Sequence, residues 1–107
     1  MKHVLFICSQ NKLRSPTAEQ IFKNNIGIVT LSAGTDKDAA YQVSLDDIEW
    51  ADEIFAMEKR HKNLLTKRFN SHLKNKKIIT LNIPDEYKYM DPFLIEILKE
   101  KLKDFIN

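Results

Sequence analysis

Short apolar runs alternate with helical patterns along the chain, and this alternation is the feature that most constrains its fold. Glycine and proline together number only five residues, so most of the chain is predicted to be regular structure. Strands that alternate with helices are typical of a parallel sheet with helices on both faces. The apolar runs have the length of strands and cover His3–Ile7, Ile28–Ala33, Glu53–Met57 and Lys77–Ile83.

Four helices are predicted between and after these strands, each marked by a start signal or an apolar stripe. The first follows Ser15, since proline is tolerated at the first helical position, and its apolar stripe extends to Ile26. Asp91 is the predicted N-cap of the last helix. The predicted helices begin in turn at Pro16, at a capping box on Ser44, at Glu58 and at Pro92. Together the elements predict an α/β fold, a doubly wound four-stranded parallel sheet flanked by helices.

The 107 residues include one cysteine, Cys8, which excludes an internal disulfide and a cysteine-rich zinc site. The length predicts a single domain over residues 1–107. No run approaches the roughly 20 apolar residues of a membrane span, and the N-terminus lacks a secretory signal pattern. We therefore predict a reduced, cytoplasmic compartment and no membrane partner. Cys8 follows the first predicted strand, at the sheet edge where ligands bind in such folds.

The segment after the first strand has the pattern C-x5-R-S, in which Cys8 is followed by Arg14 and Ser15. A thiolate is the reactive form of cysteine and is favoured at a helix N-terminus beside an arginine. Backbone N–H groups of a tight loop bind anions, and the planar guanidinium of Arg14 can bind two phosphate oxygens at once. Ser15 can donate a hydrogen bond to the thiolate while it caps the helix. We predict a phosphate-binding loop formed by Ser9, Gln10, Asn11, Lys12, Leu13, Arg14 and Ser15.

This loop resembles the signature C-x-G-N-x-C-R-S of the low-molecular-weight protein tyrosine phosphatases. The matching residues are Cys8, Asn11, Arg14 and Ser15. The resemblance implies that Asn11 takes the left-handed backbone conformation, which asparagine tolerates well. Gln10 stands in place of the family's glycine, and Leu13 in place of its second cysteine. The protective disulfide of the family therefore cannot form, and Cys8 depends on an external thiol for rescue after oxidation.

The resemblance extends over nearly the whole chain. Ser32–Thr35 reads S-A-G-T and Ala51–Glu58 reads A-D-E-I-F-A-M-E, both similar to family segments at the second and third strands. It implies a sheet in the order 2-1-3-4, with the phosphate-binding loop after strand 1. The segment between Thr35 and Ser44 is shorter than in typical members, so a region that usually helps to wall the pocket is trimmed. The chain resembles a short, single-cysteine variant of the family.

Asp85 is the predicted general acid, the group that protonates the leaving oxygen. The resemblance implies an aspartate within I-P-D-P-Y after the last strand, and Ile83–Tyr87 reads I-P-D-E-Y. Asp91 stands in a second D-P dipeptide and is the alternative, but it already serves as a predicted N-cap. Tyr87 falls where the family's pocket-wall aromatic is expected, so we predict that it contacts the substrate.

We predict phosphomonoester hydrolysis through a phosphocysteine intermediate, with no metal and no other cofactor. The predicted partners are a phosphotyrosine-containing protein or a small aryl phosphate, together with phosphate and related oxyanions. Arsenate reduction with an external thiol and a phospho-ligand binding module without turnover are the alternatives. A sugar-transport phosphocarrier also places a cysteine after its first strand, but Arg14 and Asp85 favour hydrolysis over relay.

Charged residues are segregated along the chain. Asp36–Glu58 holds eight acidic residues and one lysine, whereas Lys59–Lys77 holds eight basic residues and no acidic one. Such blocks are typical of solvated helix faces, and a basic block also suits an anionic partner. The formal net charge of +2 is too small to indicate nucleic acid as that partner. Three histidines lack metal-ligand spacing and are predicted to be structural or exposed: His3, His61 and His72.

Overall fold

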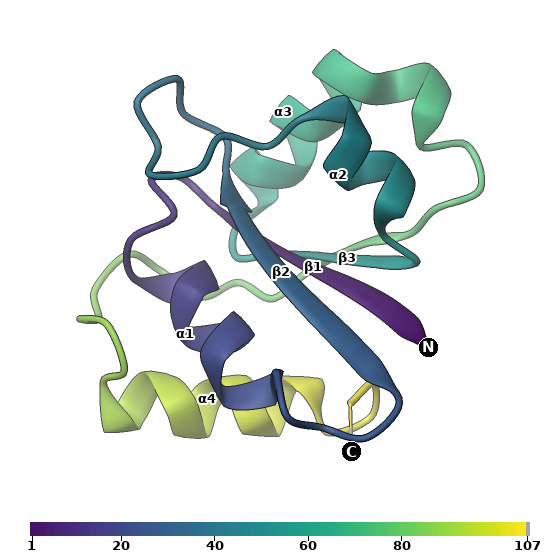
Figure 1. Cartoon of the computed structure of the whole chain (residues 1–107). Coiled ribbons are helices and arrows are strands. Elements are labelled where there is room, and N and C mark those ends of the chain that lie inside the picture. The colour runs from purple at the N-terminus through teal and green to yellow at the C-terminus, as the bar shows by residue number, and fades with distance from the viewer. Residues whose placement is uncertain (107) are drawn as a thin grey trace.

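A computed structural model describes residues 1–106 and shows four strands in one parallel sheet (Figure 1). The strands are β1 (Lys2–Cys8), β2 (Ile28–Gly34), β3 (Glu53–Ala56) and β4 (Ile78–Thr80). Their order is β2-β1-β3-β4, which confirms the predicted doubly wound sheet. β1 is therefore central, and Cys8 at its end is in register with Gly34 of β2.

Helices cover both faces of the sheet (Figure 1). The helices are α1 (Arg14–Phe22), α2 (Leu45–Trp50), α3 (Lys59–Phe69) and α4 (Pro92–Leu102), with a 3-10 turn η1 (Asn70–His72) after α3. α1 and α4 pack on one face, and α2 and α3 pack on the other. Side chains of β1 alternate between the two faces, because successive residues of a strand point to opposite sides. Phe6 therefore packs toward α4, whereas Ile7 packs toward α2 and α3.

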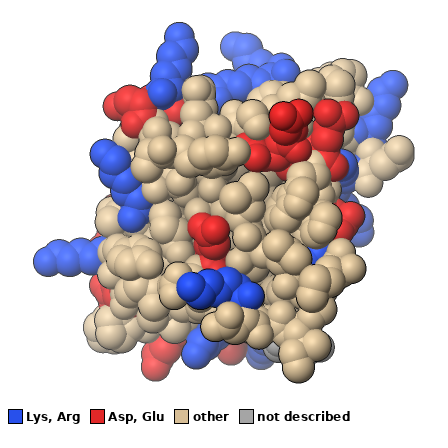
Figure 2. All heavy atoms as spheres, viewed as in Figure 1, with Lys and Arg blue, Asp and Glu red and all other residues tan. Residues whose placement is uncertain are grey.

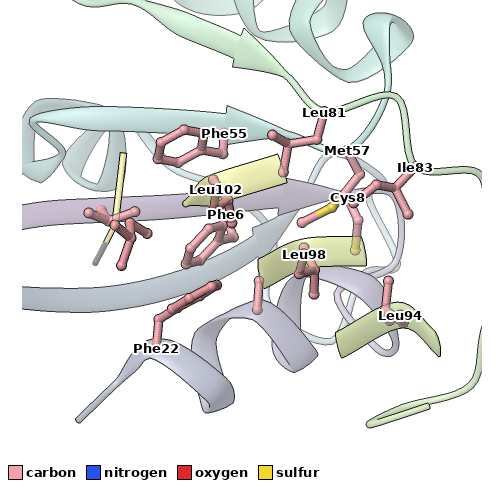
Figure 3. Packing of buried hydrophobic residues seen from close by; sticks show 13 residues of the cluster. Phe6, Cys8, Phe22, Phe55, Met57, Leu81, Ile83, Leu94, Leu98 and Leu102 are labelled. Carbon is pink, nitrogen blue, oxygen red and sulfur yellow. The ribbon is translucent and has the colours of Figure 1, made fainter. Parts of the chain in front are cut away.

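The core under α1 and α4 is aromatic at its centre. The ring of Phe6 stacks with Phe55 at a centroid distance of 5.7 Å and with Phe22 at 6.1 Å (Figure 3). Leucines of α4 close this core from outside, and burial of each such side chain contributes about 1.5–3 kcal/mol to stability. Cys8 belongs to the same buried cluster, beside Ile83 (Figure 3). The end of β1 is thus anchored by the hydrophobic core.

Two predicted helix starts are confirmed together with their caps. The hydroxyl oxygen of Ser44 accepts the Asp47 N–H at 3.3 Å, and the Asp47 carboxylate accepts the Ser44 N–H at 2.9 Å. The Asp91 carboxylate accepts the Phe93 N–H at 2.9 Å, and Pro92 is the first residue of α4. A cap of this kind contributes about 1 kcal/mol, so Asp91 has a structural role at the start of α4.

The predicted fourth strand is too long. β4 ends at Thr80 instead of Ile83, because Asn82 has a φ of 56° and breaks the extended backbone. The chain still follows β3 beyond this point, since the Ile83 N–H bonds to the Met57 carbonyl oxygen at 2.8 Å. The segment that follows therefore leaves the sheet at its carboxyl edge, next to the end of β1.

The predicted first helix also differs from the structure. α1 begins at Arg14, two residues before Pro16, and ends at Phe22. Ile26, predicted as the end of the apolar stripe, lies after the helix and is fully exposed. The chain must turn there to enter β2, and Gly27 allows the turn with a φ of 86°.

The helices are short. The longest, α3 and α4, have 11 residues each, whereas a membrane span needs about 20. Within residues 1–106, no helix is both long enough and apolar enough to cross a bilayer.

Candidate active site

The predicted phosphate-binding loop lies at the carboxyl edge of the sheet, between β1 and α1. Cys8 is the last residue of the central strand, is 3% exposed and is a free thiol. Glu58 follows β3 and Asp85 follows β4 at this same edge. The fold therefore gathers residues from three strand ends at the place where ligands bind in open parallel sheets.

Two donors point at the sulfur of Cys8. The Asn11 N–H donates to Sγ at 3.3 Å, and the Ser15 hydroxyl lies 2.9 Å from Sγ. The hydroxyl oxygen of Ser15 also accepts a hydrogen bond from the Asn11 side-chain amide at 3.0 Å. Its one proton has two acceptors in reach, the Ala33 carbonyl oxygen at 3.5 Å and the sulfur, and the sulfur is the nearer. Both donors stabilise negative charge on the sulfur. Ser15 lies inside α1, so the prediction that it caps the helix is wrong: the N-cap is Leu13, which makes no side-chain cap.

Asn11 shapes the loop, as the resemblance implies. Its φ of 56° is left-handed, and its buried side chain donates a second hydrogen bond to Ser32 Oγ of β2 at 2.9 Å. Ser32 in turn donates to the Glu19 carboxylate of α1 at 2.5 Å. This network joins the loop to β2 and α1, so the donors around Cys8 are held before any ligand binds.

The guanidinium of Arg14 is only 2% exposed and is held along one side. Its Nη1 bonds to Glu58 Oε2 at 2.5 Å and to the Ile83 carbonyl oxygen at 2.8 Å. Burial of Glu58 would raise its pKa, but hydrogen bonds from Arg60 and Arg14 outweigh burial and lower the pKa of that carboxyl. Glu58 is therefore a carboxylate near pH 7, and the Nε–Nη2 side of Arg14 stays available for an anion.

Asp85 approaches that second side of the guanidinium. Its Oδ1 lies 3.8 Å from Arg14 Nε, and the residue is 54% exposed. Cys8, Arg14 and Asp85 together line a cavity of about 160 Å³, whose other lining residues are Gln10, Lys12 and Leu13. A buried thiol, a guanidinium and an exposed carboxyl group thus line one cavity, which has the size of a small anion and the group bonded to it.

Sequence comparison identifies no relative: neither a family model nor a curated protein matches the chain. Structural comparison finds proteins of similar fold. A low-molecular-weight protein tyrosine phosphatase from Streptococcus pyogenes matches with a TM-score of 0.78 and 18% identity, over 100% of this chain and 95% of that one. A low-molecular-weight phosphotyrosine phosphatase from Vibrio cholerae O395 matches with a TM-score of 0.72 and 25% identity, over 97% and 95% of the two chains.

The chain has the fold of the low-molecular-weight protein tyrosine phosphatases. The same fold occurs in YwlE, an arginine phosphatase from Geobacillus stearothermophilus, which matches with a TM-score of 0.65 and 24% identity over 97% of this chain and 85% of that one. The predicted resemblance is thus matched by the three-dimensional structure over nearly the whole chain.

In this phosphatase fold, the predicted loop residues divide into two groups. Gln10, Lys12, Leu13 and Arg14 line the cavity. Ser9, Asn11 and Ser15 are buried and bond to the protein around the loop. The second group holds the loop in place, and the first group faces the cavity.

Gln10 replaces the glycine of the family signature and attaches the loop to the shortened segment after β2. Its side-chain amide donates to Asp36 at 2.5 Å and to Asp38 at 3.1 Å, while its backbone carbonyl oxygen accepts the Ala40 N–H at 2.9 Å. Gly34 permits this contact, since a Cβ there would lie 2.5 Å from the Ser9 carbonyl oxygen. Residues 36–40 therefore form a compact wall against the outer side of the loop.

None of the chain's three tyrosines lines the cavity. Tyr87 is partly buried and packs against the core under α4; it is not among the residues that line the cavity. Tyr89 is half exposed. Tyr41 donates a hydrogen bond to Asp47 at 2.8 Å, and this bond raises the pKa of Tyr41. Contact between Tyr87 and a substrate stays a prediction.

His61 is a site residue that the sequence did not single out. It is fully buried, and its Nδ1 accepts the Glu58 N–H at 3.0 Å. Its Nε2 therefore carries the ring proton and donates to Ser9 Oγ at 2.8 Å. Burial, with the positive charges of Arg14 and Arg60, lowers the pKa of His61 to about 4. The neutral ring links α3 to the residue directly after Cys8.

The other two histidines lie outside the site. His3 stacks on Trp50 with a centroid distance of 4.5 Å, and His72 is exposed. Among residues 1–106, no group of three or more histidine, cysteine, aspartate or glutamate side chains is arranged to hold a metal ion. The place of Glu58 at this edge of the sheet could have been found from the sequence, because it is the first charged residue after the third predicted strand, but its contact with Arg14 has no signal there.

Proposed function

We propose that this protein hydrolyses phosphate monoesters through a covalent phosphocysteine on Cys8. One observation carries the proposal: Cys8, Arg14 and Asp85 line the same small cavity. They supply a nucleophile, an anion-binding fork and a proton donor, which are the groups that this reaction requires. The fold of the low-molecular-weight protein tyrosine phosphatases supports a cysteine-dependent phosphatase.

In the first proposed step, the Cys8 thiolate attacks phosphorus. An S–P bond forms, and the bond between phosphorus and the ester oxygen breaks. The free side of the Arg14 guanidinium and the loop N–H groups bind the equatorial oxygens, whose charge they stabilise in the loose transition state. Asp85 enters as the carboxylic acid and gives its proton to the leaving oxygen, so the alcohol or phenol departs neutral.

In the second proposed step, water hydrolyses the phosphocysteine. Asp85, now a carboxylate, accepts a proton from the water molecule while the water oxygen attacks phosphorus. The S–P bond breaks, inorganic phosphate leaves, and the thiolate and the acid are both regenerated. The hydrogen bonds from Ser15 and Asn11 to sulfur favour this step, because they stabilise Cys8 as a leaving group.

The proposed substrate is the phosphotyrosine of a protein, or a small aryl phosphate. Leu13 lines the cavity with an apolar side chain that is 36% exposed and can contact an aromatic ring. Lys12 adds a positive charge at the same cavity, which repels a cationic leaving group such as the guanidinium of phosphoarginine. These two residues favour an aryl ester over the substrate for which YwlE is named.

The test compares three reactions of the purified protein: hydrolysis of an aryl phosphate, hydrolysis of phosphoarginine, and arsenate-dependent consumption of a small thiol. We expect aryl phosphate turnover that vanadate inhibits and that Cys8→Ser abolishes. Thiol consumption without aryl phosphate turnover would identify a reductase instead. Vanadate binding without any turnover would identify a phospho-ligand binding module.

A further inference from the structure

A hollow of about 400 Å³ lies between α3 and the edge strand β4, apart from the cavity that holds Cys8. We call it the lysine groove. It is lined by Lys62, Thr66 and Asn70 of α3 and η1, by Leu73, Lys74, Lys76 and Lys77 of the connection, and by Ile78 and Ile79 of β4. Basic side chains gather along the rim of the molecule where Figure 1 places α3 (Figure 2).

Three of the four lysines are free to bind a partner. Lys62, Lys74 and Lys77 are exposed, and none of them forms an ion pair within residues 1–106. Lys76 differs, because its amine donates to the carbonyl oxygens of Glu49 and Ala51 at 2.8 Å each and so stabilises the end of α2. The groove therefore presents three ammonium groups without intramolecular counter-charges.

The floor of the groove is apolar and contains a sheet edge. Leu73 is buried and Ile78 is partly buried on the face of the sheet that α2 and α3 cover, whereas the side chain of Ile79 packs toward the α4 face. β4 pairs only with β3 among the strands of residues 1–106, so its outer edge has no strand beside it. Lysines around an apolar floor at a strand edge fit an extended peptide that carries both carboxylates and an apolar side chain.

The charge distribution favours a short acidic segment over a long polyanion. Acidic side chains gather over α2, next to the basic rim (Figure 2), and Lys76 joins the end of α2 to the groove. A nucleic acid that extends past the groove would meet this acidic surface, and the net charge of the chain is only +2. A peptide confined to the groove meets the lysines alone.

We propose that the lysine groove binds an acidic, extended segment of a partner protein. Carboxylates of the segment pair with Lys62, Lys74 and Lys77, and one apolar side chain of the segment lies on Leu73 and Ile78. The binding does not involve Cys8 and requires no turnover, so it holds or fails independently of the proposed phosphatase activity.

The test measures fluorescence anisotropy of a labelled peptide in which acidic residues flank a single leucine. We expect salt-sensitive binding, which the triple variant Lys62→Glu, Lys74→Glu and Lys77→Glu weakens by about tenfold or more, since three exposed pairs become repulsive. The matched control changes three lysines that are exposed outside the groove to glutamate, namely Lys23, Lys99 and Lys101. This variant should bind the peptide as the wild type does. A change of the peptide leucine to serine should also weaken binding.

Four outcomes would overturn the proposal. They are unchanged affinity in the groove variant, equal loss in the control variant, no effect of the leucine change, and tighter binding of a single-stranded oligonucleotide of equal charge. Thermal melting checks that both triple variants fold. If the glutamate variant does not fold, the same three lysines changed to glutamine remove the charges without adding repulsion, and a smaller loss of affinity in the same direction, about threefold or more, is expected.

Discussion

The loop of residues 8–15 and the segment of residues 81–91 both contribute to the candidate active site, but the protein holds them very differently. Five of the eight loop residues are buried, and among them Asn11 and Ser15 bond to β2, while Arg14 bonds to Glu58 after β3 and to Ile83 after β4. The segment is mostly exposed, and Asp85 at its centre is 54% exposed. The loop is the buried, fixed half of the site, and the segment that carries Asp85 is the exposed half.

The segment is attached at its two ends. Ile83 bonds to Met57 through its N–H and to Arg14 through its carbonyl oxygen. Met90, whose φ of 60° is left-handed, donates its N–H to Thr17 Oγ1 at 2.9 Å. In the proposed mechanism, the groups that bind the anion are therefore preorganised, whereas the group that transfers the proton is a side chain held only from the two ends of its segment. Substitutions in the loop should therefore slow the turnover of every substrate, whereas the effect of substitutions in the segment should depend on the leaving group.

The largest expected effect comes from breaking the buried half. Arg14→Lys should lower kcat/KM for an aryl phosphate by about 10³-fold, because an ammonium group cannot bind two phosphate oxygens in a fork or keep the bonds to Glu58 and Ile83. The matched control is Arg60→Lys, at an exposed partner of Glu58, which should change the rate by about threefold or less. Equal losses in the two variants would mean that Arg14 does not bind phosphate.

The second effect tests the exposed half. Asp85→Asn should lower kcat by about 10²-fold for a substrate with a poor leaving group, and much less for one with a good leaving group, because only the former needs a proton. Asp91→Asn is the matched control, since asparagine caps a helix as well as aspartate does and α4 stays intact. A larger loss at Asp91 would reassign the general acid.

The third effect concerns the link between α3 and the loop. The pKa of His61 is about 4 in the folded state and 6.5 ordinarily. Between pH 4 and pH 6.5 the unfolded chain therefore binds a proton at this ring that the folded chain does not bind. The free energy of unfolding should therefore fall as the pH drops from 6.5 to 4, by on the order of 2 kcal/mol. His61→Gln should remove this part of the pH dependence, whereas His72→Gln, at an exposed ring, should not.

Denaturant titrations at several pH values measure this difference. A His61→Gln variant with the same pH slope as the wild type would show that the ring is not held neutral. Its activity near pH 7 adds a second readout, because loss of the hydrogen bond to Ser9 should lower kcat/KM without changing the preference between leaving groups.

The smallest effect sharpens the boundary of the fixed half. Gln10→Ala removes the bonds to Asp36 and Asp38 and should lower the free energy of unfolding by about 1 kcal/mol. We also expect a rise in KM with little change in kcat, because the wall of residues 36–40 loosens while Cys8 and Arg14 stay in place. Gln20→Ala, at an exposed position of α1, is the control. The same KM in both variants would mean that the wall does not affect binding.

The loop could be predicted from the sequence because its chemistry is local. The nucleophile, the anion-binding turn and Arg14 lie within eight consecutive residues, between an apolar run and a helix. The strand order followed from the resemblance. By contrast, the roles of Glu58 and His61 depend on β1 lying beside β3. The spacing of these residues in the sequence does not indicate that Glu58 contacts Arg14 or that His61 contacts Ser9.

The errors were also of one physical kind. The extra length given to β4 continued an extended pattern past Asn82, whose left-handed φ breaks it, and the stripe extended to Ile26 continued a helical pattern past Phe22, where α1 ends before the turn at Gly27. Ser15 has the residue type of an N-cap, but the sulfur of Cys8 and the amide of Asn11 hold its hydroxyl instead. Tertiary contacts decided these cases, and a local pattern does not contain them.

The central claim is that Cys8 carries the phosphoryl group between its departure from the ester and its transfer to water. Its most direct test is mass spectrometry of the Asp85→Asn variant, quenched during turnover of an aryl phosphate with a good leaving group. The first step should then proceed while hydrolysis is slow, so we predict a protein that gains one phosphoryl group, mapped to Cys8. A phosphoryl group on another residue, or steady turnover with no labelled protein in that variant, would contradict the account.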